Sequence, residues 1–174
     1  MEWNDRFMEM LRAGVDRYHE RPTTSVGHFF LQEELALLAE IGSSAEETYA
    51  YIKEFATKGD PGPSTILLIA SIRRSFFLTA QRGVVNKVDP VKARDLPSES
   101  EVMQDIPYLP RIMRKAEAKL YGSLDPSVMY YDEKDRVFLR EHGNIHPADF
   151  LHQTWMARGD KQKVLVMVLN AMKN

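Results

Sequence analysis

Two adjacent arginines interrupt the most apolar stretch of the chain. Arg73 and Arg74 lie within residues 66–78, where the other side chains are aliphatic, aromatic or small. At 100° per residue, Arg73 shares a helical face with Ile69 and Phe77, and that face should pack against the core. Arg74 lies at the edge of this face, where it is better able to reach solvent or a ligand. A guanidinium on a core face needs a counter-charge, because arginine stays protonated in proteins.

An earlier segment supplies a carboxylate in a matching position. Glu34 projects into an apolar arc, with Phe30 and Leu38 one helical turn away on either side. We expect Glu34 and Arg73 to form a buried ion pair that fixes the register of two helices. Two alternatives stay open. Either the arginines bind a carboxylate or phosphate in a pocket, or their side chains extend to solvent.

Histidine and aspartate side chains gather near the C-terminal end of the chain. His142 and His146 are four residues apart, and Asp149 and His152 follow. This spacing matches neither the helical His-Glu-x-x-His pattern nor a closed zinc site. We therefore expect no metal, and we keep His142, His146 and Asp149 only as candidate ligands. The simpler interpretation places His146 near a helix N-cap and Asp149 in the first helical turn.

Charged side chains also cluster between these two regions. Asp132, Glu133 and Asp135 lack the loop spacing and the glycine of a calcium site, so we interpret them as acids that complement a helix dipole. Four basic residues are expected opposite the apolar stripe of a helix: Arg111, Arg114, Lys115 and Lys119. We expect this basic face to be solvated. The alternative is a surface that binds phosphates or an acidic partner.

The composition of the chain excludes several classes of protein. Its 174 residues include no cysteine, which excludes disulfides and thiol catalysis and leads us to expect a cytoplasmic location. The formal net charge of −2 lacks the basic character of a nucleic-acid-binding domain. No apolar stretch reaches the ~20 residues that a membrane span needs. We find no phosphate-binding loop or serine elbow, so the sequence implies no cofactor.

Apolar residues recur at three- and four-residue steps through most of the chain, which predicts an all-α protein. Capping residues, glycines and prolines delimit the expected helices. The first helix runs to about residue 20 and is followed by a break at 21–24. The next helices are expected over 25–41, 44–57, 64–83, 107–121, 134–141 and 147–157. Asp160 caps the last helix. The run Val164–Leu169 also has the composition of a buried strand, but its length and cap favour a helix.

These elements predict a compact bundle of about seven to eight helices, in one lobe or two. Residues 1–83 are expected to form an N-terminal four-helix lobe, and residues 107–174 a C-terminal helical lobe. Periodicity fades over 84–106, where aspartate, proline, serine and glutamate accumulate. We interpret this stretch as a connector with one short helical turn around 99–104.

Several short motifs follow one another in the C-terminal third. They are Leu109-Pro110-Arg111-Ile112, Lys115-Ala116-x-Ala118-Lys119-Leu120-x-Gly122, Asp135-Arg136-x-Phe138-Leu139 and Ala148-Asp149-Phe150-Leu151. This order resembles a bacterial family known as domain of unknown function 5069, over about residues 106–174. Residues 30–81 resemble the N-terminal extension of its longer members. The stretch 130–134 departs from the glycine-rich, cysteine-containing version in those members. The resemblance implies a compact helical fold and supplies no established activity, so no catalytic residue is carried over.

Two functional hypotheses follow from the sequence. The first is a non-enzymatic helical binding or interaction module, because the chain assembles no nucleophile, base and oxyanion donor. The alternative is an enzyme or small-anion-binding protein, with a pocket between the second and fourth helices. There Arg73 and Arg74 would bind the anion and Glu34 would act as general base. The expected partner is a small anion or a protein, and nucleic-acid binding through the fifth helix ranks last.

Overall fold

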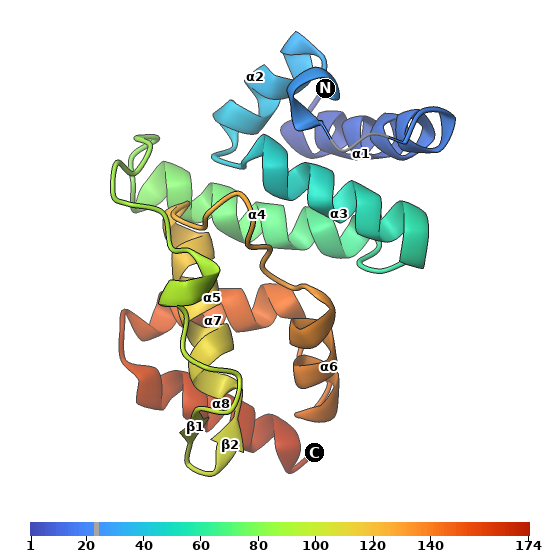
Figure 1. Ribbon diagram of the computed structural model, residues 1–174. Coiled ribbons are helices and arrows are strands. Elements are labelled where there is room, and N and C mark those ends of the chain that lie inside the picture. The colour runs from blue at the N-terminus through green and yellow to red at the C-terminus, as the bar shows by residue number, and fades with distance from the viewer. Residues whose placement is uncertain (23–24) are drawn as a thin grey trace. The chain divides into compact units, whose positions relative to one another are not determined.

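The computed structural model describes residues 1–22 and 25–174. Within these residues it contains eight α-helices, two short 3-10 turns and one hairpin of two-residue strands (Figure 1). The predicted all-α class is therefore confirmed. The chain divides into two units, Met1–Val85 and Asn86–Asn174. No helix among the described residues is both long and apolar enough to cross a membrane.

The first unit is built around its first helix. Its elements are α1 (Trp3–Glu20), the 3-10 turn η1 (Val26–His28), α2 (Gln32–Glu40), α3 (Ala45–Lys58) and α4 (Pro63–Thr79). Helix α1 contacts α2, α3 and α4 (Figure 1). It approaches α3 closely at Gly14, where an added Cβ would lie 2.7 Å from Cδ1 of Ile52. Only a glycine allows this approach without displacing the isoleucine.

The helix boundaries in the first unit follow local capping. Ser44 caps α3, since its hydroxyl accepts the Glu47 N–H at 3.1 Å, as predicted. Helix α2 was predicted from residue 25 but begins at Gln32. The N–H of Leu31 donates to the Glu34 carboxylate at 2.8 Å, and this bond closes the helix start at a residue type that gives no capping signal. Residues 23 and 24 of the predicted break lie outside the described residues.

The second unit consists of four helices, a 3-10 turn and a small hairpin. These are η2 (Ala93–Asp95), β1 (Val102–Met103), β2 (Ile106–Pro107), α5 (Leu109–Tyr121), α6 (Glu133–Glu141), α7 (Pro147–Ala157) and α8 (Lys161–Met172). Helix α7 contacts both α5 and α8. The run Val164–Leu169 lies within α8, so the prediction of a helix there is confirmed. The carboxylate of Asp160 accepts the Gln162 N–H at 3.1 Å and caps this helix.

The stretch predicted as a connector is largely part of the second unit. Val91 and Leu96 are buried in an apolar cluster with Ala118 and Val128, and Val91 forms a parallel bridge with Leu124. The helical turn predicted around 99–104 is wrong, because β1 and β2 pair there as an antiparallel hairpin. Its two turn residues, 104 and 105, both have positive φ, which suits a tight hairpin turn.

Candidate functional site

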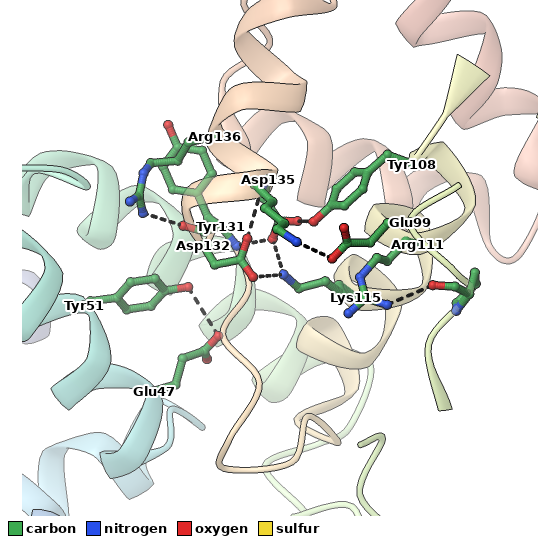
Figure 2. Close-up of polar contacts among 12 residues, drawn as sticks. Glu47, Tyr51, Glu99, Tyr108, Arg111, Lys115, Tyr131, Asp132, Asp135 and Arg136 are labelled. Carbon is green, nitrogen blue, oxygen red and sulfur yellow. Dashed lines mark hydrogen bonds and ion pairs between the residues drawn. The ribbon is translucent and has the colours of Figure 1, made fainter. Parts of the chain in front are cut away.

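The second unit buries a lysine and an aspartate against each other. Lys115 lies in the middle of α5 and Asp135 in the first turn of α6, and their side chains are 1% and 0% exposed. The Lys115 ammonium donates to Oδ2 of Asp135 at 2.5 Å and to Oδ2 of Asp132 at 2.8 Å (Figure 2). The Asp132 side chain is 40% exposed. The ammonium therefore bridges one buried carboxylate and one that faces solvent.

Asp135 receives two further donors from residues outside its helix. The Tyr108 hydroxyl donates to Oδ1 at 2.7 Å, and the Tyr131 backbone N–H donates to Oδ2 at 2.8 Å (Figure 2). Together with Lys115, these groups engage both carboxylate oxygens. We refer to Tyr108, Lys115, Asp132 and Asp135 as the charged cluster.

The N-terminus of α6 positions the acidic half of the charged cluster. Asp132 is the N-cap, since its Oδ1 accepts the Asp135 N–H at 3.0 Å. Glu133 and Asp135 lie in the first turn, where negative charge is favoured by the helix dipole. This agrees with the helix-terminus interpretation of the three acids. Asp132 therefore has two roles, because one oxygen caps the helix and the other binds lysine.

Both tyrosines that donate to Asp135 have left-handed backbone conformations. The φ angle is 72° at Tyr108 and 66° at Tyr131. Such a conformation costs on the order of 1–3 kcal/mol for a non-glycine residue and persists only where surrounding contacts impose it. At Tyr131 the N–H is held by Asp135, and the carbonyl accepts from Arg136 Nη1 at 3.1 Å. The buried Asp135 carboxylate thus binds the residues that precede α5 and α6, Tyr108 and Tyr131, in these conformations.

Burial dominates the electrostatics of the charged cluster. It raises the pKa of Asp135, because loss of hydration outweighs the opposing effect of the Lys115 ammonium. Burial and the neighbouring Asp135 also raise the pKa of the Tyr108 phenol. Tyr108 therefore stays protonated at neutral pH and acts as a hydrogen-bond donor. The shift at Tyr108 favours a fixed hydrogen-bond donor over a group that exchanges protons at neutral pH.

A short segment borders the cluster beside the basic side chains of α5 and α6. Arg111 donates to the carbonyl of Pro97 at 2.9 Å, and the exposed Lys134 pairs with Glu99 at 2.6 Å (Figure 2). The hydrogen bond from Lys134 lowers the pKa of Glu99. Residues 97–99 are thus attached to both helices by side-chain contacts.

The predicted solvated basic face of α5 is wrong for two of its four residues. Lys115 and Lys119 are only 1% and 6% exposed. The reason is that α5 is enclosed on more than one side, since it contacts α7 and its Lys115 binds the acidic N-terminus of α6. Arg114 is half-buried and pairs with Glu117 of its own helix at 3.1 Å.

In the first unit, the predicted ion pair between Glu34 and Arg73 is wrong. The buried Glu34 carboxylate accepts from Nη1 and Nη2 of Arg17 at 3.1 and 3.0 Å. Arg17 also donates to the carbonyl of Phe29 at 2.7 Å. Helix α1, which carries Arg17, packs against α2 and supplies the counter-charge there. The core-facing position predicted for Glu34 is nevertheless confirmed.

Arg73 is buried, as its helical face predicted, but its partner is neutral. Its Nη1 donates to Oε1 of Gln81 at 2.6 Å, and its guanidinium lies 5.1 Å from the centre of the Phe77 ring. Burial lowers the pKa of Arg73 to about 10, with the charge of Glu47 acting in the opposite direction. The side chain is therefore still cationic at neutral pH.

Arg74 is half-buried and lies against an aromatic ring of α1. Its guanidinium carbon is 5.0 Å from the centre of the Trp3 ring. Its Nε is buried and has no hydrogen-bond acceptor in the described part of the protein. The predicted grouping of Glu34, Arg73 and Arg74 is therefore not observed as one contact network. Glu34 is engaged by Arg17, and the two arginines have different neighbours.

The histidines near the C-terminal end serve local structure. His146 is the N-cap of α7, where its Nδ1 accepts the Ala148 N–H at 3.1 Å, in agreement with its interpretation as a residue near a cap. The ring of His142 stacks on Phe138, with ring centres 4.1 Å apart. Asp149 is exposed in the first turn of α7. In the described part of the chain, no three His, Cys, Asp or Glu side chains are grouped as metal ligands.

The charged cluster itself was missed from the sequence. A partial signal was present, because Arg111 and Lys115 are four residues apart and so share a face of α5, and Tyr108 directly precedes this helix. Asp132 and Asp135 are three residues apart, at the spacing of an N-cap and the third residue of a helix. Nothing local indicated that these residues would meet. Comparison of the chain with family models, curated proteins and solved structures finds no match.

Proposed function

We propose that this protein is a non-enzymatic helical binding or interaction module. The observation that carries the proposal is the state of the Asp135 carboxylate. Both of its oxygens accept hydrogen bonds from within the chain, from Lys115, Tyr108 and the Tyr131 backbone. A general base or nucleophile must instead offer a lone pair to a substrate. The charged cluster therefore suits a scaffold that holds α5 against α6.

The enzymatic alternative loses its proposed base. It assigned that role to Glu34, whose carboxylate accepts two hydrogen bonds from Arg17 and one from the Leu31 N–H. Both oxygens of this carboxylate are therefore engaged by groups of the chain itself. Binding of an anion by arginine does not need this carboxylate, so the binding part of the alternative is compatible with the module.

We also propose that the chain belongs to the bacterial domain of unknown function 5069 family and works in the cytoplasm. Two of the motifs that carry the resemblance contain Lys115 and Asp135, and these residues are in direct contact. A family motif whose members meet in space has a physical reason to recur. The absence of cysteine supports a reducing compartment.

Replacement of Lys115 by methionine tests the scaffold role without any ligand. The variant Lys115→Met leaves a buried carboxylate without its cation, so we expect a loss of about 3–5 kcal/mol of unfolding free energy. Urea unfolding followed by circular dichroism measures this loss. The matched control is Lys163→Met, at an exposed lysine of α8, which should stay within about 0.5 kcal/mol of wild type.

A Lys115→Met variant that loses no stability would indicate that the charged cluster serves binding or catalysis and not the fold. Residues kept for activity are commonly held at the expense of stability, so their replacement leaves stability unchanged or raises it. A Lys115→Met variant as stable as wild type, or more stable, would therefore contradict the scaffold and reopen the enzymatic alternative.

A further inference from the structure

Arg74 differs from the other cationic side chains that are not exposed. In the described part of the chain, Lys119 has an interaction within the protein. Each of the other such cations has a hydrogen-bond acceptor: Arg6 with Glu40, Arg17 with Glu34, Arg73 with Gln81, Arg111 with the Pro97 carbonyl, Arg114 with Glu117, Lys115 with Asp135, and Arg136 with the Tyr131 carbonyl. Arg74 has none, and its Nε is buried. A buried donor without an acceptor is unfavourable, so this group requires an explanation.

The surroundings of Arg74 hold its guanidinium in place. The group lies over the Trp3 ring, with 5.0 Å between the guanidinium carbon and the ring centre. Such a contact uses the face of the guanidinium and leaves the N–H groups at its edge. Two N–H groups on one edge match the two oxygens of a carboxylate or phosphate. The contact with Trp3 leaves the terminal N–H groups of Arg74 available for bidentate binding.

The local charge also favours an anion. Helix α4 contains two arginines, Arg73 and Arg74, and no acidic residue. Arg73 donates to Gln81. Trp3 is the first residue of α1, so the positive end of this helix dipole lies at Trp3, with Asp5 in the first turn partly offsetting it.

We propose that Arg74 and Trp3 bind a small oxyanion, with Nη1 and Nη2 of Arg74, the two nitrogens that are not buried, each donating one hydrogen bond to it and Trp3 packing beside the guanidinium. Carboxylate and phosphate share the required geometry, and both are included. This inference rests on the proposed binding function and names the chemical class of its ligand. It does not depend on the charged cluster of the second unit.

Trp3 provides a direct reporter of this site. The chain contains two tryptophans, so a Trp155→Phe variant leaves Trp3 as the source of the indole fluorescence. We would titrate this variant with inorganic phosphate and, separately, with succinate at constant ionic strength, using chloride as the salt control. We expect a saturable change with at least one oxyanion and none with chloride. The oxyanion that gives the change identifies the phosphate or the carboxylate class.

Variants of Arg74 assign the binding to this side chain. Arg74→Gln should weaken it by about tenfold or more, because two charge-assisted hydrogen bonds are lost. Arg74→Lys keeps the charge without the fork, so its affinity should fall between those of Arg74→Gln and the parent. The matched control is Arg12→Gln, at an exposed arginine of the same unit, which should leave affinity unchanged within about twofold.

Two results would overturn the proposal. One is the absence of a saturable change with either oxyanion. The other is a saturable fluorescence change that persists in Arg74→Gln. If Arg74→Gln does not fold, an undiminished fluorescence change in Arg74→Lys counts in the same way. Failure of oxyanion binding is distinguishable from failure of the scaffold role, because the latter is judged by the stability of Lys115→Met without any anion.

Discussion

Asp135 concentrates the chemistry of the second unit at a single residue. Its carboxylate accepts from an ammonium, a phenol and a backbone amide, and its own N–H donates to the Asp132 side chain. Removal of either neutral donor would leave a buried acceptor less well satisfied, which costs about 1–3 kcal/mol, and removal of the Lys115 ammonium costs more. The residue therefore links α5, α6 and the turn before α6.

The raised pKa of Asp135 predicts the sign of a pH dependence. Because burial holds this pKa above its ordinary value of 3.8, the folded protein binds the proton more tightly than the unfolded chain. The contribution of Asp135 to stability is therefore fully present below that ordinary value and is lost as pH rises through the folded-state pKa. We expect the unfolding free energy of wild type, relative to Asp135→Asn, to fall as the pH rises above that ordinary value of 3.8.

Urea unfolding of the two proteins across this pH range measures that difference. Asp135→Asn is the reference protein, because it keeps every other titrating group, and subtracting its unfolding free energy isolates the contribution of Asp135. A difference that rises with pH would mean that the Lys115 ammonium outweighs burial, and this would contradict a raised pKa for Asp135.

At the scale of elements, helix ends explain several residues whose types suggested chemistry. His146 and Asp149 were candidate metal ligands, but His146 caps α7 and Asp149 occupies its first turn. Asp132 likewise caps α6, and Glu34 bonds the amide before α2. Polar side chains near helix starts satisfy amides that have no partner within the helix. Such residues are therefore weak indicators of a metal or catalytic site.

Removal of the α7 cap should destabilise the protein by a modest amount. His146→Ala leaves the Ala148 N–H without its acceptor, and we expect a loss of about 0.5–2 kcal/mol. His146→Ser supplies a hydroxyl oxygen at the same position and should recover most of that loss. Thermal unfolding of the three proteins measures both effects. Equal losses in the alanine and serine variants would show that the imidazole contributes something other than the cap.

At the scale of the whole molecule, local sequence patterns predicted the helices. The contacts between residues far apart in sequence could not be predicted from these patterns. The helical class and the stretch Val164–Leu169 followed from periodicity and caps, which depend on neighbouring residues. The hairpin of β1 and β2 was missed because its strands have two residues each, too few for a periodic signal. Burial of Arg73 and Glu34 followed from their helical faces. Their partners did not, since several arginines could have met Glu34.

The charged cluster illustrates the same limit. By residue type, Lys115 is expected at the surface, because lysine is seldom fully buried without a partner. Its partners lie 17 and 20 residues away in sequence, at the start of another helix. Only the packing of α5 and α6 brings them together. For this reason, the candidate site could be predicted as charged residues on helical faces, but not as one network.

A double-mutant cycle on Lys115 and Asp135 tests the central claim most directly. Urea unfolding of wild type, Lys115→Met, Asp135→Asn and the double variant gives the coupling energy between the two side chains. A scaffold pair predicts a favourable coupling of about 1–3 kcal/mol, with the double variant losing less than the sum of the single losses. Single variants that cause no loss, or losses that add within about 0.5 kcal/mol, would contradict it.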